Sequence, residues 1–333
     1  MNRRMALAAG AALFTWLAAG AVGGGANPSA QARDAKSASG ARVRINRVIE
    51  KLEAGAVVYG PQITGPAIGS AEFAIDLSRA ADKIQFVSWD VKNGMFDLGR
   101  LQMSLLGLLD RADILKRASV QHGITSFARV PLRPHDDPAF VVGEMLDMGL
   151  TGFVFPEIDN RKQAEAAIRA MRYPHRDGYQ SPAGYTGGHV GSAARAAWYW
   201  GVSEAEYRRR ADVWPLNPDG ELFAMVQVET VEAVKNLKEI ITTPGLGAVL
   251  IGANTLTDSM GIKVSGLVTG PAGAPPAVEK VMQQIVATCH EYKVPCAIPV
   301  AGNTREEGVA LQQRRITEGF QIMYLTGAPA TYR

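Results

Sequence analysis

Residues 223–252 read FAMVQVETVEAVKNLKEIITTPGLGAVLIG, and this segment decides the fold. It begins with an apolar run at 223–229 and ends with another at 248–252. Between them, at 231–242, apolar residues recur at the spacing of one helix face. Short continuous apolar runs are typical of strands buried on both faces of a parallel sheet, and the connection between two parallel strands is usually a helix. The segment is therefore predicted to be a strand–helix–strand unit.

The same alternation continues along most of the chain. Short apolar runs predict strands at 56–60, 84–90, 126–131, 152–157, 223–229, 248–252, 296–300 and 321–325. Helical periodicity predicts helices at 46–54, 70–81, 98–122, 137–148, 161–172, 231–242 and 277–292. About eight parallel strands that alternate with helices, in a chain of this length, predict the α/β class and a (β/α)8 TIM barrel.

The bulk composition is that of a globular protein. The chain has 333 residues, 47% of them hydrophobic, and a formal net charge of +3. The length allows one large domain, which we place at 46–333, and the weak basic excess gives no indication of a nucleic-acid partner. The longest connection, at 173–222, is rich in Gly, Tyr and Pro. A connection of that length is usually functional or an oligomer contact.

The amino-terminal residues 1–32 have the pattern of a secretory signal peptide. A short basic start precedes an apolar stretch at 5–21, and the Ala-Gln-Ala that ends at Ala32 fits a small-x-small cleavage site. A single membrane anchor is the alternative, but the apolar stretch is short for a span. We expect cleavage near Ala32, a flexible lead at 33–45, no stable membrane insertion afterwards, and a secreted or periplasmic protein. The early Arg pair leaves the general and twin-arginine export routes both open.

The sequence contains two cysteines, Cys289 and Cys296. Their spacing is not a metal signature. Buried free thiols are the favoured interpretation, and an oxidising compartment would also permit a disulfide.

Polar residues follow the carboxyl ends of the predicted strands, where the active sites of such barrels lie. They are Asp90, Arg129, Glu157, Gln227, Glu229, Asn254, Thr255 and Asn303. Two carboxylates at adjacent strand ends suit a hard cation such as Mg²⁺ or Mn²⁺. An Arg beside them can clamp a substrate carboxylate with its bidentate fork. Together they favour a site in which a metal polarises the oxo group of a 2-oxo acid.

Each of these residues also has a structural interpretation. A single acid at a strand end is more often a helix cap or an ion-pair partner than a metal ligand. Arg129 could simply pair with a carboxylate in the barrel mouth. The set as a whole is more indicative than any one member.

Four longer motifs carry a family resemblance. They are FVSWDVKNGMFDLGRL at 86–101, FARVP at 127–131, FVFPEIDNRKQAEAAIRAMRYPHR at 153–176 and MVQVETVEAVKNLKEIITTPGLGAVLIGANTLTDSMG at 225–261. Over 46–327 the chain resembles the HpcH/HpaI family of metal-dependent class II pyruvate aldolases, which includes 2-dehydro-3-deoxyglucarate and 4-hydroxy-2-oxoheptanedioate aldolases. The resemblance implies a barrel of the phosphoenolpyruvate/pyruvate-binding type, a divalent metal (Mg²⁺ or Mn²⁺), a small oxo-acid substrate and a homo-oligomer.

The resemblance also implies roles for individual residues. Glu229 matches the family's metal-binding Glu, and Gln227 matches a Gln that lines the pyruvate site. Arg129 matches the Arg that contacts the oxo acid, and Asp90 matches the Asp beside the catalytic base. Further substrate-binding positions fall at Gly252, Ala253 and Asn254.

Two positions depart from the family. The family usually continues the turn after its Asp as Asp-x-Glu-His-Gly, whereas this chain has Asp-Val-Lys-Asn-Gly, which puts Asn93 at the catalytic His. The family's Gly-Pro-x-Asp-Leu-Ser is Gly-Ala-Asn-Thr-Leu-Thr here, which puts Thr255 at the second metal ligand. Asn cannot carry a proton, and losing a carboxylate lowers the charge that holds a cation.

Several residues could compensate for these losses. Glu157 is hypothesised to replace the lost Asp as metal ligand or to supply a base, with Asp258 as a weaker candidate. Lys92 could act as a base or form a Schiff base, although a solvated surface Lys is the commoner case. In the long connection, His175 or Tyr179 could serve a different lyase reaction.

The function predicted from the sequence is a carbon–carbon lyase of the aldolase type, in which metal-assisted retro-aldol cleavage releases pyruvate or a related oxo acid. The catalytic set would be Asp90, Asn93 and Arg129. The alternative is a catalytically degenerate periplasmic barrel that binds a small carboxylate or oxo acid without turnover.

Overall fold

The computed structural model describes residues 43–94, 96–133, 135–173 and 191–326. The predicted signal peptide at 1–32 and most of the lead at 33–45 lie outside the described residues. His175 and Tyr179 also lie outside them. No helix in the described ranges combines the length and the apolar character needed to cross a membrane.

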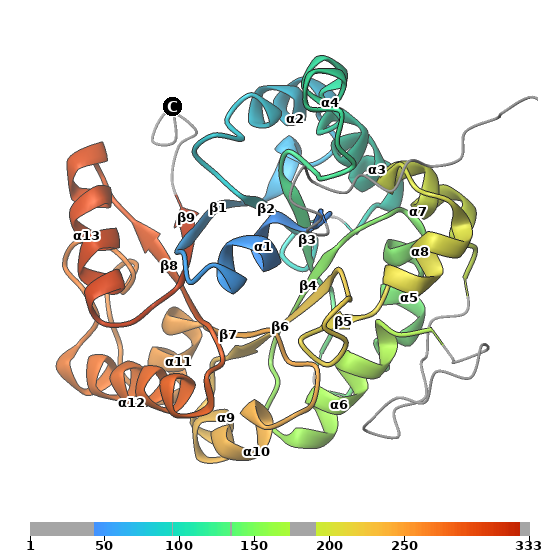
Figure 1. Ribbon diagram of the computed structural model, residues 1–333. Coiled ribbons are helices and arrows are strands. Elements are labelled where there is room, and N and C mark those ends of the chain that lie inside the picture. The colour runs from blue at the N-terminus through green and yellow to red at the C-terminus, as the bar shows by residue number, and fades with distance from the viewer. Residues whose placement is uncertain (1–42, 95, 134, 174–190, 327–333) are drawn as a thin grey trace, which may run out of the picture. The chain divides into compact units, whose positions relative to one another are not determined.

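Eight parallel strands form a closed ring, as predicted (Figure 1). The strands are β1 (Val58–Ile63), β2 (Phe86–Asp90), β3 (Thr125–Arg129), β4 (Gly152–Phe155), β6 (Leu222–Val228), β7 (Ala248–Ile251), β8 (Cys296–Ala301) and β9 (Ile322–Thr326). Neighbouring strands pair in chain order, β4 pairs with β6, and the ring closes where β9 pairs with β1. The fold is therefore the (β/α)8 barrel expected from the apolar runs.

One further strand, β5 (Val213–Trp214), was not predicted. It pairs with Leu222 and Phe223, the first two residues of β6, at the amino end of the barrel. Two residues are too few to produce a recognisable apolar run, so the sequence pattern gave no signal for it.

Thirteen α-helices surround or cap the ring within the described residues. They are α1 (Arg47–Glu53), α2 (Ala71–Ser78), α3 (Leu98–Gly107), α4 (Arg111–Arg117), α5 (Ala139–Asp147), α6 (Arg161–Ala170), α7 (Ala193–Trp200), α8 (Glu204–Arg210), α9 (Val231–Lys235), α10 (Leu237–Ile241), α11 (Ala253–Ser259), α12 (Pro276–Tyr292) and α13 (Arg305–Thr317).

Three predicted segments differ in detail. The single helix predicted at 98–122 is wrong, because the Asp110 carboxylate accepts hydrogen bonds from the backbone N–H groups of Ala112 and Asp113 and so starts a second helix. The helix predicted at 231–242 divides at Asn236 into α9 and α10. The connection at 173–222 is not a continuous loop, because α7, α8 and β5 lie within it.

The barrel interior is filled by side chains and is closed at one end by α1. Phe86, Phe127 and Phe223 stack in sequence, with ring centroids 5.3 Å and 5.7 Å apart. Val48 and Ile49 of α1 pack into the same buried cluster. Asn46, which caps α1, donates to the carbonyl oxygens of Thr151 and Glu221, just before β4 and β6. Helix α1 therefore covers the amino ends of the strands and leaves the carboxyl ends for chemistry.

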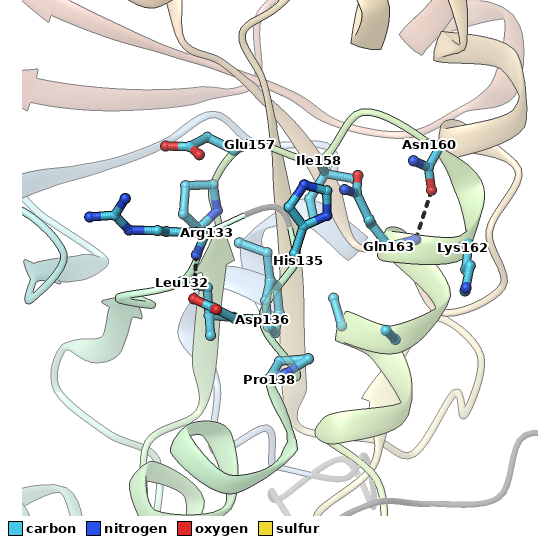
Figure 2. Close-up of a pocket in the computed structure, with 14 residues that line it drawn as sticks. Leu132, Arg133, His135, Asp136, Pro138, Glu157, Ile158, Asn160, Lys162 and Gln163 are labelled. Atoms are coloured by element: carbon cyan, nitrogen blue, oxygen red, sulfur yellow. Dashed lines mark hydrogen bonds between the residues drawn. The ribbon is translucent and has the colours of Figure 1, made fainter.

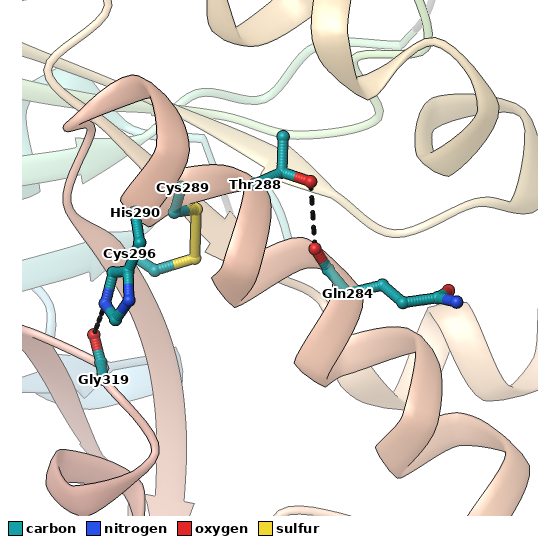
Figure 3. Close-up of a disulfide and its surroundings, with 6 residues drawn as sticks. All are labelled: Gln284, Thr288, Cys289, His290, Cys296 and Gly319. Carbon is teal, nitrogen blue, oxygen red and sulfur yellow. Dashed lines mark hydrogen bonds between the residues drawn. A yellow bond between two sulfur atoms is a disulfide. The ribbon is translucent and has the colours of Figure 1, made fainter.

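The interpretation of Cys289 and Cys296 as free thiols is wrong. The two residues form a disulfide between the last turn of α12 and the start of β8 (Figure 3). Lys293 ends α12 in the left-handed region, and the chain turns back at once into β8. This reversal brings the two Cα atoms to 6.0 Å, a separation that a disulfide spans.

Candidate active site at the carboxyl ends of the strands

Asp90, the last residue of β2, is the centre of a hydrogen-bond network at the barrel mouth. It lies opposite Arg129, the last residue of β3, in the strand register. Arg129 Nη1 lies 3.2 Å from Asp90 Oδ2, and Gln62 Nε2 of β1 donates to the same oxygen over 2.7 Å. Asp90 is 1% exposed, so its charge is satisfied by these partners and not by water. The pairing of Arg129 with a carboxylate in the barrel mouth, which was the structural alternative for this residue, is thus present.

Asn93 belongs to the same network. Its backbone N–H donates to Asp90 Oδ1 over 3.1 Å, and its side-chain Nδ2 donates to Asp90 Oδ2 over 2.9 Å. Asp90 therefore holds the turn after β2 in place much as a capping carboxylate holds a helix start. The Asn93 amide serves this structural purpose and, having no titratable proton, cannot act as an acid or a base.

Glu229 and Gln227 form a second group, at the end of β6. Gln227 Nε2 donates to Glu229 Oε2 over 2.8 Å, and Glu229 is 1% exposed. Gly252, which follows β7, lies directly against this pair. A Cβ atom there would stand 2.5 Å from the Glu229 Cβ and 2.6 Å from Gln227 Nε2, so the position has no room for a side chain.

Glu157 connects the two groups, and its backbone is strained. Its φ of +55° lies in the left-handed region, which costs an L-residue roughly 1–2 kcal/mol. In this conformation its N–H donates to Glu229 Oε1 over 2.9 Å. Its carboxylate forms an ion pair with Lys92 from the turn after β2. The strands that precede the two acids are neighbours as predicted, because β4 pairs with β6, although β4 ends at Phe155 and Glu157 lies in the loop that follows it.

Burial raises the pKa of the Glu229 carboxyl. The Arg129 guanidinium, the Glu157 N–H, the Lys92 ammonium and the Thr255 hydroxyl act in the opposite direction, and burial outweighs them. Glu229 consequently holds a proton more readily than an exposed Glu does.

Some of the remaining predicted residues lie close to Glu229, and others lie away from it. Thr255 is near, since its hydroxyl acts on Glu229. Ala253 is buried at the start of α11, and its carbonyl accepts the Thr257 hydroxyl over 2.7 Å. Asn254 is exposed, and its Oδ1 accepts from the Val268 N–H over 3.1 Å, which fixes a loop. Asp258 and Asn303 are exposed.

Sequence reasoning missed Gln62. Its strand was predicted to end at residue 60, but β1 continues to Ile63 and delivers the Gln62 amide to Asp90. A polar side chain directly after an apolar run was the available signal, and the preceding Pro61 obscured it because Pro usually stands at strand edges.

The carboxylates at the mouth do not fit a divalent ion. Within the described ranges, no three His, Cys, Asp or Glu side chains converge as metal ligands do. Both Glu229 oxygens accept protein hydrogen bonds, and the Glu157 carboxylate is paired with Lys92. Hard cations usually gather several free oxygen donors, whereas here most are already engaged.

Two buried polar atoms at the mouth lack a hydrogen-bond partner among the described residues. They are Gln227 Oε1 and Arg129 Nε. Buried polar atoms in proteins are normally paired, so atoms like these are candidates for ligand contacts. One acceptor and one donor without partners, on residues that contact Glu229 and Asp90, suit a small polar acid.

A separate cavity of about 380 Å³ lies beside the mouth, between the loops that follow β3 and β4 (Figure 2). Its lining includes His135, Asn160, Lys162 and Gln163, and it reaches Glu157 at one edge. Figure 2 shows the Glu157 carboxylate turned away from His135. Asp90, Arg129, Gln227 and Glu229 do not line it, so this cavity is distinct from the network described above.

Comparison with known proteins supports the family resemblance that was described in the sequence analysis. The sequence model of the HpcH/HpaI aldolase/citrate lyase family matches residues 112–321. A hydroxypyruvate/pyruvate aldolase of Pseudomonas aeruginosa is 35% identical over 130 residues, which is 39% of this chain and 42% of that protein. A 4-hydroxy-2-oxo-heptane-1,7-dioate aldolase of Escherichia coli is 31% identical over 162 residues, which is 48% of this chain and 52% of that protein. The matched segments span about half the length of these curated relatives.

Solved structures show the same architecture. An HpcH/HpaI aldolase/citrate lyase family protein of Burkholderia cenocepacia J2315 superposes with a TM-score of 0.63 at 23% identity, over 86% of this chain and 94% of that chain. An HpcH/HpaI aldolase of Desulfitobacterium hafniense DCB-2 superposes with a TM-score of 0.61 at 21% identity, over 85% of this chain and 91% of that chain. At these identities the likeness supports the fold.

Proposed function

The chain belongs to the HpcH/HpaI aldolase/citrate lyase family, and on this premise we propose that it is a carbon–carbon lyase that cleaves a 4-hydroxy-2-oxo acid and releases pyruvate or a related oxo acid. The sequence relatives named above are oxo-acid aldolases. The observation that carries the proposal is Arg129, a largely buried guanidinium that pairs with Asp90 at the barrel mouth and whose charge also acts on Glu229.

The reaction defines what the site must do. In a retro-aldol cleavage the 4-hydroxyl loses its proton, the bond between C3 and C4 breaks, and an aldehyde leaves. The electron pair remains on the oxo-acid fragment as an enolate, which is then protonated at C3. The site must therefore bind the substrate carboxylate, stabilise negative charge on the oxo oxygen and move protons.

Arg129 is assigned to the substrate carboxylate. Asp90 takes one of its Nη1 contacts, and Nε has no partner among the described residues, so donors remain for a ligand. A guanidinium that is oriented before binding loses less entropy when it forms a bidentate contact. Gln227 Oε1 is assigned as an acceptor for a substrate hydroxyl, since its amide nitrogen is already fixed on Glu229.

The proton carrier is assigned to a carboxylate. Asn93 cannot transfer a proton, and Asp90 accepts four donor contacts from three residues, whereas Glu229 accepts two. Glu229, whose pKa is raised by burial, and Glu157, 31% exposed at its side chain, are the remaining acids at the mouth. Glu229 is the better candidate, because an acid with a raised pKa exchanges protons closer to neutrality.

A divalent metal is implied by the family resemblance, with Glu229 and Glu157 as the proposed ligands. The donor set described above does not fit such an ion, and we assign no step to it. For Glu157 to serve as second ligand, its carboxylate would have to leave Lys92 and turn toward Glu229.

An assay of pyruvate release tests the proposed lyase. The purified chain is given 4-hydroxy-2-oxo acids that differ in their aldehyde half, and pyruvate is followed by coupled reduction to lactate. We expect turnover that Arg129→Met reduces roughly 10- to 150-fold, because a hydrogen bond to a charged group is worth about 1.5–3 kcal/mol. Absence of pyruvate release with every substrate, with and without Mg²⁺ or Mn²⁺, contradicts the lyase.

Binding without turnover is the second candidate function. It is favoured by Asn93, whose amide holds Asp90 at the position where the family carries its base. A binder should show a raised melting temperature with pyruvate and no product with any 4-hydroxy-2-oxo acid. The melting temperature with pyruvate and the assay of pyruvate release together distinguish a lyase from a protein that only binds the oxo acid.

We further propose that the protein is exported. The buried Cys289–Cys296 disulfide supports this proposal, because disulfides persist mainly in oxidising compartments. Cell fractionation of the full-length chain tests it. A full-length product that stays in the cytoplasm with both thiols alkylatable contradicts export.

A further inference from the structure

We infer that the Lys92 ammonium supplies the positive charge on the substrate's oxo oxygen, so that this site binds and activates its oxo acid without a divalent metal. The inference takes its ligand class from the proposed function. It concerns a residue in the turn after β2 and the acid that holds it, Glu157.

The carboxylates of the mouth are already neutralised within the protein. Asp90 accepts hydrogen bonds from Gln62, Asn93 and Arg129. Glu229 accepts from the Glu157 N–H on one oxygen and from Gln227 on the other. A divalent ion would have to compete with these contacts and with the repulsion of the two cations at the mouth.

Lys92 is held at the mouth and is not free in solvent. Its side chain is 18% exposed, and its Nζ pairs with the Glu157 carboxylate. The strands that lead into these loops, β2, β3, β4 and β6, are successive neighbours in the ring. Lys92 therefore reaches past β3, which carries Arg129, to the loop after β4, and its charge acts on Glu229 at the end of β6.

Glu157 is the positioning residue in this arrangement. Of the three non-glycine residues with positive φ in the described ranges, Ala118 and Lys293 end helices, whereas Glu157 stands in the loop at the mouth. Its strained backbone directs the N–H to Glu229 while its side chain holds Lys92. Strain that is retained at a loop of this kind is typical of functional sites.

The placement of the two cations suits the reaction. An oxo acid brings a carboxylate and develops a second negative charge on its oxo oxygen during cleavage. The mouth offers two cations, Arg129 and Lys92, each with one carboxylate partner. With Arg129 on the substrate carboxylate, Lys92 is the cation left for the enolate oxygen, and a fixed ammonium in a partly dry site stabilises such a charge.

Calorimetric titration of pyruvate into the full chain tests the inference. After exhaustive chelation we expect an affinity within twofold of that measured with excess Mn²⁺. Lys92→Met should weaken binding at least tenfold under both conditions, while Lys92→Arg retains part of it. Lys116→Met, at an exposed position on α4, is the matched control and should leave the affinity unchanged. Thermal melts establish that each variant is folded.

Three outcomes overturn the inference. The first is binding that chelation abolishes and Mn²⁺ restores, which would return the role to a metal while the lyase proposal stands. The second is an unchanged affinity in Lys92→Met. The third is a covalent adduct on Lys92 after borohydride treatment, which would show an imine in place of a charge contact. Metal-free binding through Lys92 in a chain that cleaves no oxo acid would instead contradict the lyase and support the inference.

Discussion

At the barrel mouth, Asn93 and Thr255 stand where the sequence analysis expects the catalytic His and the second metal ligand of the aldolases that the chain resembles. Asn93 contributes two hydrogen bonds to Asp90 but no titratable proton. Thr255 touches Glu229 with a hydroxyl, so the buried acid lacks a second carboxylate at that place. We therefore expect proton transfer and cation binding to be altered together.

We expect that proton transfer and cation binding are both restored only when Asn93 and Thr255 are changed together. We expect Asn93→His alone, or Thr255→Asp alone, to change pyruvate release less than twofold. The double variant should raise release with Mn²⁺ at least tenfold, because it combines a proton carrier near neutrality with a second carboxylate beside Glu229. Steady-state assays with and without Mn²⁺ check this. Full recovery from Asn93→His alone would show that the remaining donors already suffice for the reaction.

The backbone strain at Glu157 predicts that one substitution can raise the stability of the protein and lower its affinity for pyruvate. Glu157→Gly should raise the free energy of unfolding by roughly 0.5–1 kcal/mol, because Gly adopts a positive φ without steric cost and the partly exposed ion pair with Lys92 contributes less than the strain. Pyruvate affinity should fall in the same variant, because Lys92 loses its partner. Urea denaturation and calorimetry give the two readings.

The matched control is Lys293→Gly, at the left-handed end of α12 with a φ of +56°. It should gain similar stability and keep its pyruvate affinity. If Glu157→Gly is less stable than the parent chain, the ion pair with Lys92 outweighs the backbone strain.

At the scale of elements, the disulfide fastens α12 to β8. The enclosed loop is short, with a sequence separation of 7, so the entropic model of cross-linking gives a contribution of about 2 kcal/mol. We expect Cys289→Ser with Cys296→Ser, or reduction of the parent chain, to lower the free energy of unfolding by about this amount. Denaturation with and without reductant measures it. Equal stability in both conditions would show that the bond adds nothing to the turn.

The strands were predictable from the sequence, and several connections were not. Buried parallel strands such as β7 need continuous apolar residues, so their runs are visible in any window. The break at Asp110 depends on a local cap that competes with an otherwise helical pattern. Helices α7 and α8 lie in a segment whose Gly, Tyr and Pro content resembled a loop.

The sequence was enough to predict which residues lie at the candidate site, but not which of them contact one another. Asp90, Arg129, Glu157 and Glu229 were found because strand ends meet at one face of a barrel. The pairing of Lys92 with Glu157 depends on a left-handed backbone that no sequence pattern announces for a Glu. The cysteines were misjudged because the spacing alone does not show that the chain reverses at Lys293.

At the scale of the whole molecule, buried His122 ties stability to pH. Burial lowers its pKa to about 4, and the charges of Arg117 and Arg210 act in the same direction. Neither ring nitrogen has a hydrogen-bond partner among the described residues, and the ring packs edge-on against Tyr199. The folded protein therefore keeps His122 neutral where the unfolded chain, with a pKa near 6.5, is already protonated.

Global stability should consequently fall on acidification. Since the folded pKa lies below the unfolded one, the full stability is present above about pH 6.5 and is lost progressively toward pH 4, by about 3 kcal/mol in all. His122→Phe should remove this part of the pH dependence, and the same change at the exposed His135 controls for loss of an imidazole. Urea titrations at several pH values measure it. An unchanged slope in His122→Phe would assign the acid sensitivity to other groups.

The closure of the ring by β9 against β1 has a consequence for how the chain folds. The residues that meet there, such as Val58 and Ile322, come from opposite ends of the described sequence. A nascent chain shorter than β9 exposes the edges of β1 and β8, and such edges pair readily with other chains. Contacts of this sequence separation form slowly. The barrel can therefore close only after β9 has been synthesised, and until then the open edges of β1 and β8 are places where the chain can aggregate.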